Sequence, residues 1–288
     1  MNFARRLQRR VLLVTDLSEG SMNSLDRAAY LCAQWECGLT ILVTKGNQAP
    51  AFSDAERAAT KYTVERRLSG WDAVPAIPIE YVAAYEPAAV AQVAAGLRPD
   101  LIVMAPPATS VLDSIFPTIP EEIAKEVRRP VLVAKLPGRS EYSSILAATD
   151  LASTSRNAAL AASAMGLAKS SRITLFHAYQ PLVATMMSSA GIDPKQIDTE
   201  AAAEERRVWN ELEVFRLEAG VDRDCTTLVS KGNPAEALLD AAASLSADLI
   251  TLGSRRRGAI SRLLAGSTVA EVLRKGRCDV LIVPGDEI

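Results

Sequence analysis

The residues best suited to chemistry lie near the C-terminal end, where an apolar run stops at a loop that contains glycines. The strand-like run 248–252 ends at Gly253, and after three arginines and Gly258 the chain reaches Gly266-Ser267-Thr268. Glycines let a backbone approach a ligand closely. The free N–H groups and the positive dipole end of a helix attract phosphate. The order of strand, glycine loop and helix start therefore predicts a cradle for the phosphates of a nucleotide.

Other phosphate-binding and catalytic motifs fit this chain poorly. Gly253 and Gly258 have the spacing of the first two glycines of a Walker A loop, but Ala259 and Ile260 stand where Lys and Ser or Thr are required. The dinucleotide fingerprint G-x-G-x-x-G and the nucleophile elbow G-x-S-x-G are absent from the sequence. The single histidine, His177, has no nucleophile paired with it in sequence. We therefore expect a binding site with neither catalytic residues nor metal ligands.

The chain is a tandem repeat. Four strand-like segments of the first half recur in the second half in the same order: 11–17 as 145–151, 39–43 as 173–177, 100–105 as 248–253, and 131–133 as 280–282. The offset grows between the second and third of these pairs, so the second copy carries about fourteen extra residues there. The phosphate loop thus lies in the second of two related units.

Length and composition agree with two domains. A chain of 288 residues is long enough for two cores. With 49% hydrophobic and only 5% aromatic residues, those cores must be built from aliphatic side chains, as in parallel sheets covered by Ala-rich helices. Pro137-Gly138 and the polar residues after them mark a linker. We predict a first domain over 1–137, a linker over 138–143 and a second domain over 144–288.

In both halves, apolar strands alternate with amphipathic helices. Strands are expected at 11–15, 39–44, 79–83, 100–104 and 131–135, and again at 145–149, 172–177, 225–229, 248–252 and 280–283. Helices are expected at 21–36, 54–69, 86–97, 119–128, 155–169, 197–219, 234–245 and 266–275. This alternation predicts an α/β fold with two tandem doubly wound domains, each a five-stranded, mostly parallel sheet flanked by helices.

Ligands of open parallel sheets bind beyond the carboxyl ends of the strands, where the strand order reverses. In the second half this rule and the loop select the following candidate nucleotide-binding residues: Ala148, Thr149, Asp150, Ala178, Leu252, Gly253, Arg255, Arg256, Gly258, Gly266, Ser267, Thr268 and Val269. A carboxylate at position 150 can accept hydrogen bonds from an adenine amino group or a ribose, or it can simply cap the next helix. Alternatively, Gly253 serves only to form a tight turn, and the arginines belong to a solvated loop.

These motifs resemble those of the universal stress protein family, and the resemblance covers both halves. Nucleotide-binding members of that family show G-x-x-G-x9-G-[ST] after the fourth strand, and Gly253, Gly266 and Ser267 stand at matching positions. Arg256 replaces the second glycine, with Gly258 displaced by two residues, and neighbouring guanidinium groups could instead reach the phosphates. The resemblance implies an adenine nucleotide alpha hydrolase-like fold.

The first half departs further from the family pattern. Its fourth strand is followed by Ala105-Pro106-Pro107-Ala108, and Pro117-Thr118-Ile119-Pro120 lies near the position of the Gly-Ser pair. Prolines remove N–H donors and fix the backbone. We therefore predict that the first half does not hold ATP in the family manner.

The family resemblance also implies a function. It suggests a non-enzymatic stress-response regulator whose second domain binds ATP or a related adenine nucleotide, with or without Mg²⁺. A nucleotide-free dimeric interaction scaffold and a slow ATPase are the alternatives. The resemblance further implies that the halves pack as a pseudo-dimer with the last strands, 131–134 and 280–283, exposed for edge pairing. A homodimer and an unidentified protein partner are expected on this basis.

Charge and hydropathy narrow the class of protein. A net charge of −2 gives no electrostatic footprint for nucleic acid. No apolar run reaches the roughly 18 residues of a membrane span, and no signal peptide is evident. We therefore expect a cytoplasmic protein. Its four cysteines, Cys32, Cys37, Cys225 and Cys278, suit reduced thiols, since Cys32 and Cys37 lack both C-x-x-C and zinc-ligand spacing.

Overall fold

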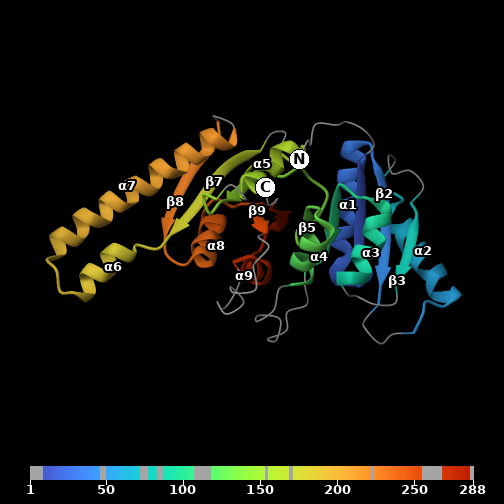
Figure 1. Cartoon of the computed structure of the whole chain (residues 1–288). Helices are drawn as coiled ribbons and strands as arrows, with labels where there is room; N and C mark the ends of the chain where they lie inside the picture. The colour runs from blue at the N-terminus through green and yellow to red at the C-terminus, as the bar shows by residue number, and fades with distance from the viewer. Residues whose placement is uncertain are drawn as a thin grey trace. The chain divides into compact units, whose positions relative to one another are not determined.

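A computed structural model of the chain describes residues 9–45, 50–71, 77–82, 87–106, 118–152, 155–168, 171–221, 224–254 and 268–285. Its contacts divide the chain into two compact units, each of which alternates strands and helices (Figure 1). The first unit comprises Met1–Glu141 with Ser254–Pro284, and the second comprises Tyr142–Gly253 with Gly285–Ile288. The division into domains at 1–137 and 144–288 stays a prediction.

The first unit is built on a mostly parallel sheet. Its strands are β1 (Arg10–Thr15), β2 (Gly38–Thr44), β3 (Ile79–Val82), β4 (Leu101–Met104), β5 (Val131–Val133) and β10 (Asp279–Pro284). They lie in the order β3-β2-β1-β4-β5-β10, and all neighbours are parallel except β5 and β10. Successive strands are therefore added on one side of β1 as far as β3 and on its other side from β4 onward. Ligands bind at such a reversal of the strand order, here between β1 and β4.

Helices flank that sheet and supply the rest of an aliphatic core. They are the short 3-10 helix η1 (Glu19–Ser21), α1 (Met22–Trp35), α2 (Asp54–Leu68), α3 (Pro87–Leu97), α4 (Ile119–Val127) and α9 (Thr268–Lys275). All four residues of β4 are fully buried, as expected for a strand covered on both faces.

β5 and β10 pair with each other in antiparallel register and are buried. The expectation that these last strands are exposed for edge pairing is therefore wrong, because each satisfies the edge of the other. Unsatisfied edges of these two strands therefore give no argument for a homodimer. The homodimer itself stays a prediction.

A buried polar cluster fastens β10 to the end of β5 and to α1. Asp279 Oδ1 accepts hydrogen bonds from the backbone amides of Lys135 (2.7 Å) and Leu136 (2.8 Å). Asp279 Oδ2 lies 3.2 Å from Arg27 Nε, an ion pair outside hydrogen-bond geometry. The backbone also passes close to α1 at Gly138, where a Cβ would collide with the backbone nitrogen of Arg27. The contacts of Asp279 thus join β10 to the first unit.

The second unit carries four parallel strands in the order β9-β6-β7-β8: β6 (Ser144–Ala148), β7 (Arg172–Tyr179), β8 (Thr226–Lys231) and β9 (Leu249–Ser254). Its helices are α5 (Arg156–Ala164), α6 (Leu182–Ser189), α7 (Pro194–Ala219) and α8 (Pro234–Ser244). The α/β class and the repeat of strand–helix units are confirmed. Here too the order reverses next to the first strand of the repeat, β6.

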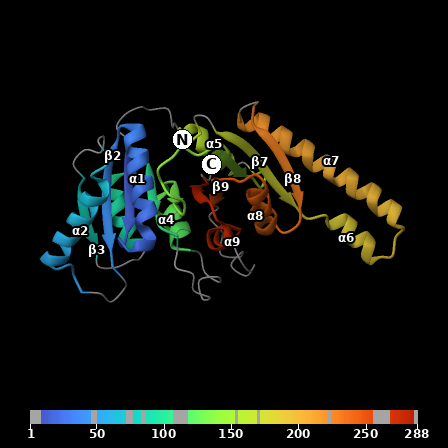
Figure 2. The same cartoon turned by 180° about the vertical axis from the view of Figure 1, so that it is seen from behind.

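The extra residues of the second copy form α6 and lengthen α7 to 26 residues. Only the C-terminal part of α7 is anchored, by Leu212, Phe215 and Ala219 packed on the sheet. Figures 1 and 2 show α6 and the N-terminal half of α7 extending beyond the end of β8. The sequence pattern missed α6. Within the described part of the chain, no helix has the length and hydropathy needed to cross a bilayer.

Candidate functional site: the strand ends of the second unit

A hydrogen-bonded turn at the end of β6 forms the centre of the candidate site. Thr149 is buried, and its Oγ1 accepts from the Leu151 amide (3.0 Å) and lies 2.6 Å from Ser155 Oγ. Ser155 Oγ donates to the Ala152 carbonyl (2.8 Å), so the Thr149 hydroxyl is the donor of their shared bond. We call this arrangement, made of Thr149, Asp150, Leu151, Ala152 and Ser155, the β6 turn.

Asp150 is the exposed residue of the β6 turn. Its Oδ1 accepts from the Ala152 amide at 3.1 Å, which is an Asx-type turn before α5 begins. Leu151 lies in the left-handed region with φ of 62°, an uncommon conformation for a branched side chain. The turn thus holds a carboxylate at the strand end, facing solvent, with part of its accepting capacity used locally.

The first unit builds the same turn after β1. Leu17 donates to Thr15 Oγ1 (3.0 Å), Thr15 Oγ1 donates to Ser21 Oγ (3.0 Å), and Ser21 Oγ donates to the Ser18 carbonyl (2.8 Å). Asp16 Oδ1 accepts from the Ser18 amide at 2.9 Å, and Leu17 has φ of 54°. Burial raises the pKa of Asp16, but hydrogen bonding, first from the Ser18 amide, outweighs it and lowers the pKa. This β1 turn shows that the geometry belongs to both repeats.

β7 is joined to the β6 turn through the backbone of Thr149. The Thr149 amide donates to the Phe176 carbonyl at 2.9 Å, and His177 Nδ1 lies 2.8 Å from the Thr149 carbonyl. A carbonyl can only accept, so Nδ1 is the donor. His177 is half-buried and acts as a strand residue, and Ala178 comes directly after it.

β9 reaches the same place through Gly253. A Cβ placed on Gly253 would lie 3.6 Å from Ser155 Cα and 3.8 Å from Ala158 Cβ, which are ordinary contacts. Gly253 also has no positive φ. Neither packing nor backbone strain demands a glycine here, which weakens the tight-turn interpretation. Thr251 Oγ1 donates to the Ala158 carbonyl at 3.0 Å and holds β9 on α5.

The structure therefore brings Ala148, Thr149, Asp150, Ala178, Leu252 and Gly253 to one edge of the second unit's sheet. Arg255, Arg256, Gly258, Gly266 and Ser267 lie outside the described residues. Thr268 and Val269 open α9, which groups with the first unit. Sequence reasoning missed Ser155, although a serine at the same offset from the Thr-Asp-Leu segment in both halves could have revealed it.

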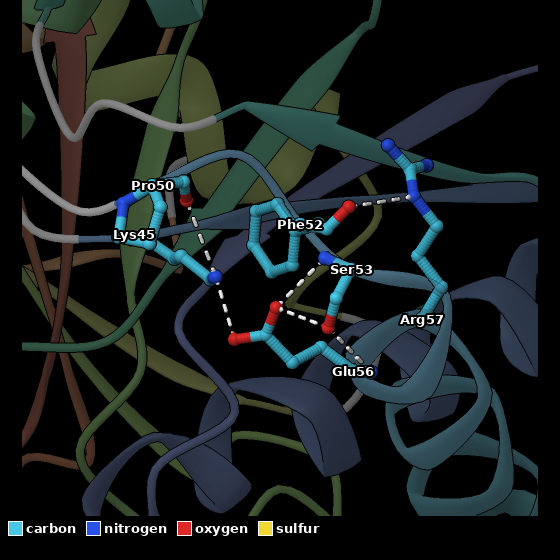
Figure 3. Close-up of polar contacts among 6 residues, drawn as sticks. All are labelled: Lys45, Pro50, Phe52, Ser53, Glu56 and Arg57. Carbon is cyan, nitrogen blue, oxygen red and sulfur yellow. Dashed lines mark hydrogen bonds and ion pairs between the residues drawn. The ribbon is translucent and has the colours of Figure 1, made fainter.

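Lys45, which follows β2 in the first unit, contacts the residues at the start of α2 (Figure 3). Lys45 Nζ lies 2.6 Å from Glu56 Oε1 and donates to the Pro50 carbonyl at 3.3 Å. Glu56 Oε2 accepts from the Ser53 amide and hydroxyl, both at 2.8 Å, and completes a capping box at the start of α2. Lys45 also lies over the Phe52 ring at 4.3 Å. The cation at the end of β2 is therefore already engaged.

This capping box predicts a specific acid sensitivity. Hydrogen bonds from Lys45 first, and then from the Ser53 amide and hydroxyl, lower the pKa of Glu56 from 4.5 to about 2. A depressed folded-state pKa stabilises the fold above pH 4.5, and this stabilisation is lost as the pH falls toward 2. The melting temperature of Glu56→Gln should therefore lie below that of the wild type at neutral pH, and the gap should close toward pH 2.

Thermal unfolding of both proteins across this pH range checks the prediction. Glu65→Gln is the matched control, because Glu65 lies on the same helix in an exposed ion pair with Lys61 (3.8 Å). Such pairs contribute little to stability. A gap between wild type and Glu56→Gln that does not change with pH would contradict the assignment.

Comparison with known proteins agrees with this architecture. The sequence model of the universal stress protein family matches residues 8–135 and again residues 141–284. The two matches cover most of the chain. The chain belongs to the universal stress protein family.

Individual relatives support a tandem universal stress protein. A universal stress protein from Thermus aquaticus is 33% identical over 147 residues, which cover 49% of this chain and 98% of the relative. Universal stress protein E from Escherichia coli K12 is 33% identical over 76 residues, 26% of this chain and only 24% of that protein. One curated relative therefore corresponds to half of this chain, and the other is matched over a quarter of its length.

Solved structures show the same fold over the whole chain. A protein of unknown function from Pseudomonas aeruginosa PAO1 has a TM-score of 0.67 at 20% identity, and the match covers 98% of this chain and 94% of the other. A universal stress protein from Archaeoglobus fulgidus has a TM-score of 0.60 at 17% identity, covering 96% and 98%. Both halves of the universal stress protein fold are thus present in one chain.

Proposed function

We propose that this universal stress protein binds ATP or a related adenine nucleotide at the strand ends of its second repeat. The observation that carries the proposal is the β6 turn. It presents the exposed Asp150 carboxylate beside Gly253, at the position where the strand order reverses. Adenine nucleotides need an acceptor for an amino or ribose hydroxyl group and an open approach for phosphates. The described strand ends supply the acceptor, and Gly253 has no side chain that could block the phosphates.

The donor set fits a nucleotide in chemical terms. Asp150 would accept a hydrogen bond from the base or the ribose through its remaining lone pairs. Gly253 places no side chain over the end of β9, and Ser254 buries a hydroxyl that has no hydrogen-bond partner within the described residues. The phosphate contacts at Gly266, Ser267, Arg255 and Arg256 stay predictions from the sequence. Mg²⁺ would neutralise phosphate charge if the nucleotide carries it.

We assign the nucleotide to the second repeat and not to the first. The two turns are alike, so the difference rests on the residues at the ends of the other strands. In the first repeat, Pro106 stands after β4 and has no N–H, whereas the residue at the matching position of the second repeat, Ser254, has one. The cation at the end of β2, Lys45, is held by Glu56. These features support a structural or regulatory role for the first half.

In the cell, this proposal corresponds to a non-enzymatic stress-response regulator. Nucleotide occupancy would change its conformation or its choice of protein partner. A cytoplasmic location and a homodimeric state belong to the same proposal. A nucleotide-free scaffold and a slow ATPase are the competing functions.

Calorimetric titration of the full chain with ATP, ADP and AMP, alongside a phosphate-release assay, separates the three functions. We expect saturable binding of at least one adenine nucleotide and no phosphate release above the spontaneous rate. Absence of binding by all three would favour the scaffold and contradict the proposal. Sustained turnover would favour the ATPase.

A further inference from the structure

Two cysteines of the first unit are brought together by the way α1 ends. Helix α1 stops at Trp35, Glu36 takes the left-handed conformation with φ of 53°, and the Cys37 amide donates to the Cys32 carbonyl at 3.0 Å. This is a Schellman motif, whose bond from the sixth residue back to the first brings the side chains of those two residues into contact. The C-x4-C spacing carries no redox signature in sequence. The contact arises from the helix end.

Other helices of this chain end with the same backbone bond but without thiols. After α5, the Leu167 amide donates to the Ala162 carbonyl at 2.8 Å, next to Gly166 with φ of 71°. That end belongs to the first helix of the second repeat and pairs two apolar side chains. The corresponding place in the first repeat therefore has an ordinary geometry with an unusual pair of side chains.

The two thiols lie beside each other at this helix end. They are 0% (Cys32) and 4% (Cys37) exposed, and each changes the pKa of the other. Residues that this motif pairs lie close enough for a disulfide, whose S–S bond is about 2 Å long. Both are free thiols in this structure. The helix end thus places the pair for an intramolecular disulfide.

We propose that Cys32 and Cys37 form a reversible disulfide when the protein meets a peroxide. The Cys37 thiolate attacks one peroxide oxygen, the O–O bond breaks, and Cys37 becomes a sulfenic acid while the other oxygen leaves as water. The Cys32 sulfur then attacks the Cys37 sulfur, the S–O bond breaks and a second water leaves. Two thiols are oxidised by two electrons, and hydrogen peroxide is reduced to two waters. A thiol reductant reverses the bond by exchange.

The order of attack is set by the surroundings of each sulfur. The hydrogen bond from Cys32 lowers the pKa of the Cys37 thiol, and Arg9 lowers it further, against the opposing effects of burial and Asp100. The same hydrogen bond and burial raise the pKa of Cys32. The thiolate is the nucleophile in such reactions, so Cys37 attacks the oxidant and Cys32 resolves the sulfenic acid.

The chain contains its own controls for burial. Cys278 and Cys225 are 4% and 8% exposed, close to the value for Cys37. General oxidation of buried thiols would therefore modify Cys225 and Cys278 as well. A reaction that depends on the helix end would leave both of them unmodified. Peroxide reaches Cys37 through local opening of the helix end, which costs less than global unfolding.

The test is disulfide mapping of the native full chain after treatment with hydrogen peroxide, followed by denaturation, alkylation and mass spectrometry. We expect one linked peptide pair joining Cys32 to Cys37, a loss of two hydrogens from the chain, and full recovery with a thiol reductant. Cys225 and Cys278 should remain open to alkylation. Failure to form this bond under conditions that oxidise an exposed thiol peptide in the same tube would overturn the proposal, as would linkage through Cys225 or Cys278.

Two variants test the order of attack. In Cys32→Ser, a 1,3-diketone probe should trap a sulfenic acid at Cys37, whereas Cys32 of Cys37→Ser should stay unmodified. Equal trapping in both variants would overturn the assignment of Cys37 as the nucleophile. Circular dichroism verifies that each variant is folded. If a variant does not fold, disulfide mapping of the wild type still decides whether Cys32 and Cys37 form the bond. None of these readouts depends on nucleotide binding.

Discussion

Replacing Asp279 by alanine is expected to lower the free energy of unfolding of the first unit by about 3–5 kcal/mol, the range found when one partner of a buried ion pair is removed. Asp279 is 0% exposed and Arg27 is 2% exposed, so the substitution removes the carboxylate from a buried guanidinium, which keeps its hydrogen bond to the Ser140 carbonyl (2.6 Å). It also removes the acceptor of the Lys135 and Leu136 amides. Buried polar groups without partners are among the most destabilising changes in proteins.

Chemical denaturation, with hydrogen exchange of β5 and β10 as a local readout, measures this loss. Asp279→Asn keeps an oxygen for the two amides and removes only the charge, so it should cost less than alanine. Asp248→Ala is the matched control, because Asp248 also accepts from two backbone amides, those of Ser143 and Ser144, but is partly exposed. Equal losses from Asp248→Ala and Asp279→Ala would show that burial of the ion pair is not the cause.

The second large effect is on nucleotide affinity. Asp150→Ala should weaken binding by about ten- to a hundredfold, since a hydrogen bond to a charged group contributes about 1.5–3 kcal/mol and 1.4 kcal/mol is tenfold in affinity. Asp16→Ala is the matched control. It removes the same carboxylate from the same turn in the repeat that we propose does not bind.

Titration of wild type and both variants under one set of conditions checks this asymmetry. Both aspartates lie at strand ends, and each accepts a hydrogen bond from the amide of the second residue after it, so we expect similar structural damage in the two variants. Thermal unfolding of each confirms that. An equal loss of affinity in both variants, or a loss confined to Asp16→Ala, would place the nucleotide elsewhere.

Much of the fold could be predicted from the sequence because its signals are local and periodic. Apolar strands alternate with helices in both halves, and Asn233-Pro234 marks the start of α8 by its capping chemistry, with Asn233 Oδ1 accepting from Ala235 and Glu236. α6 was missed because its apolar residues, Leu182 to Met187, show no clear helical period and come after a proline. Periodicity detects an amphipathic pattern, and the sequence of this short helix does not show one.

The candidate site was predicted less completely, for a different reason. The end of β6 and Gly253 are set by strand position alone, so a topological rule finds them. Ser155 contributes through a hydroxyl network that closes only when the turn is folded. The contact between Cys32 and Cys37 and the antiparallel pairing of β5 with β10 likewise depend on three-dimensional geometry. Residue spacing alone does not encode such contacts.

The number of nucleotide equivalents bound in the ATP titration tests the central claim most directly. Because the two repeats share the same turn but differ in the residues at the ends of their other strands, the proposal predicts saturation at one adenine nucleotide per chain. The affinity of that single site should fall with Asp150→Ala and stay unchanged with Asp16→Ala. Saturation at two per chain would contradict the division of labour between the repeats, and no binding at all would leave the chain as an interaction scaffold.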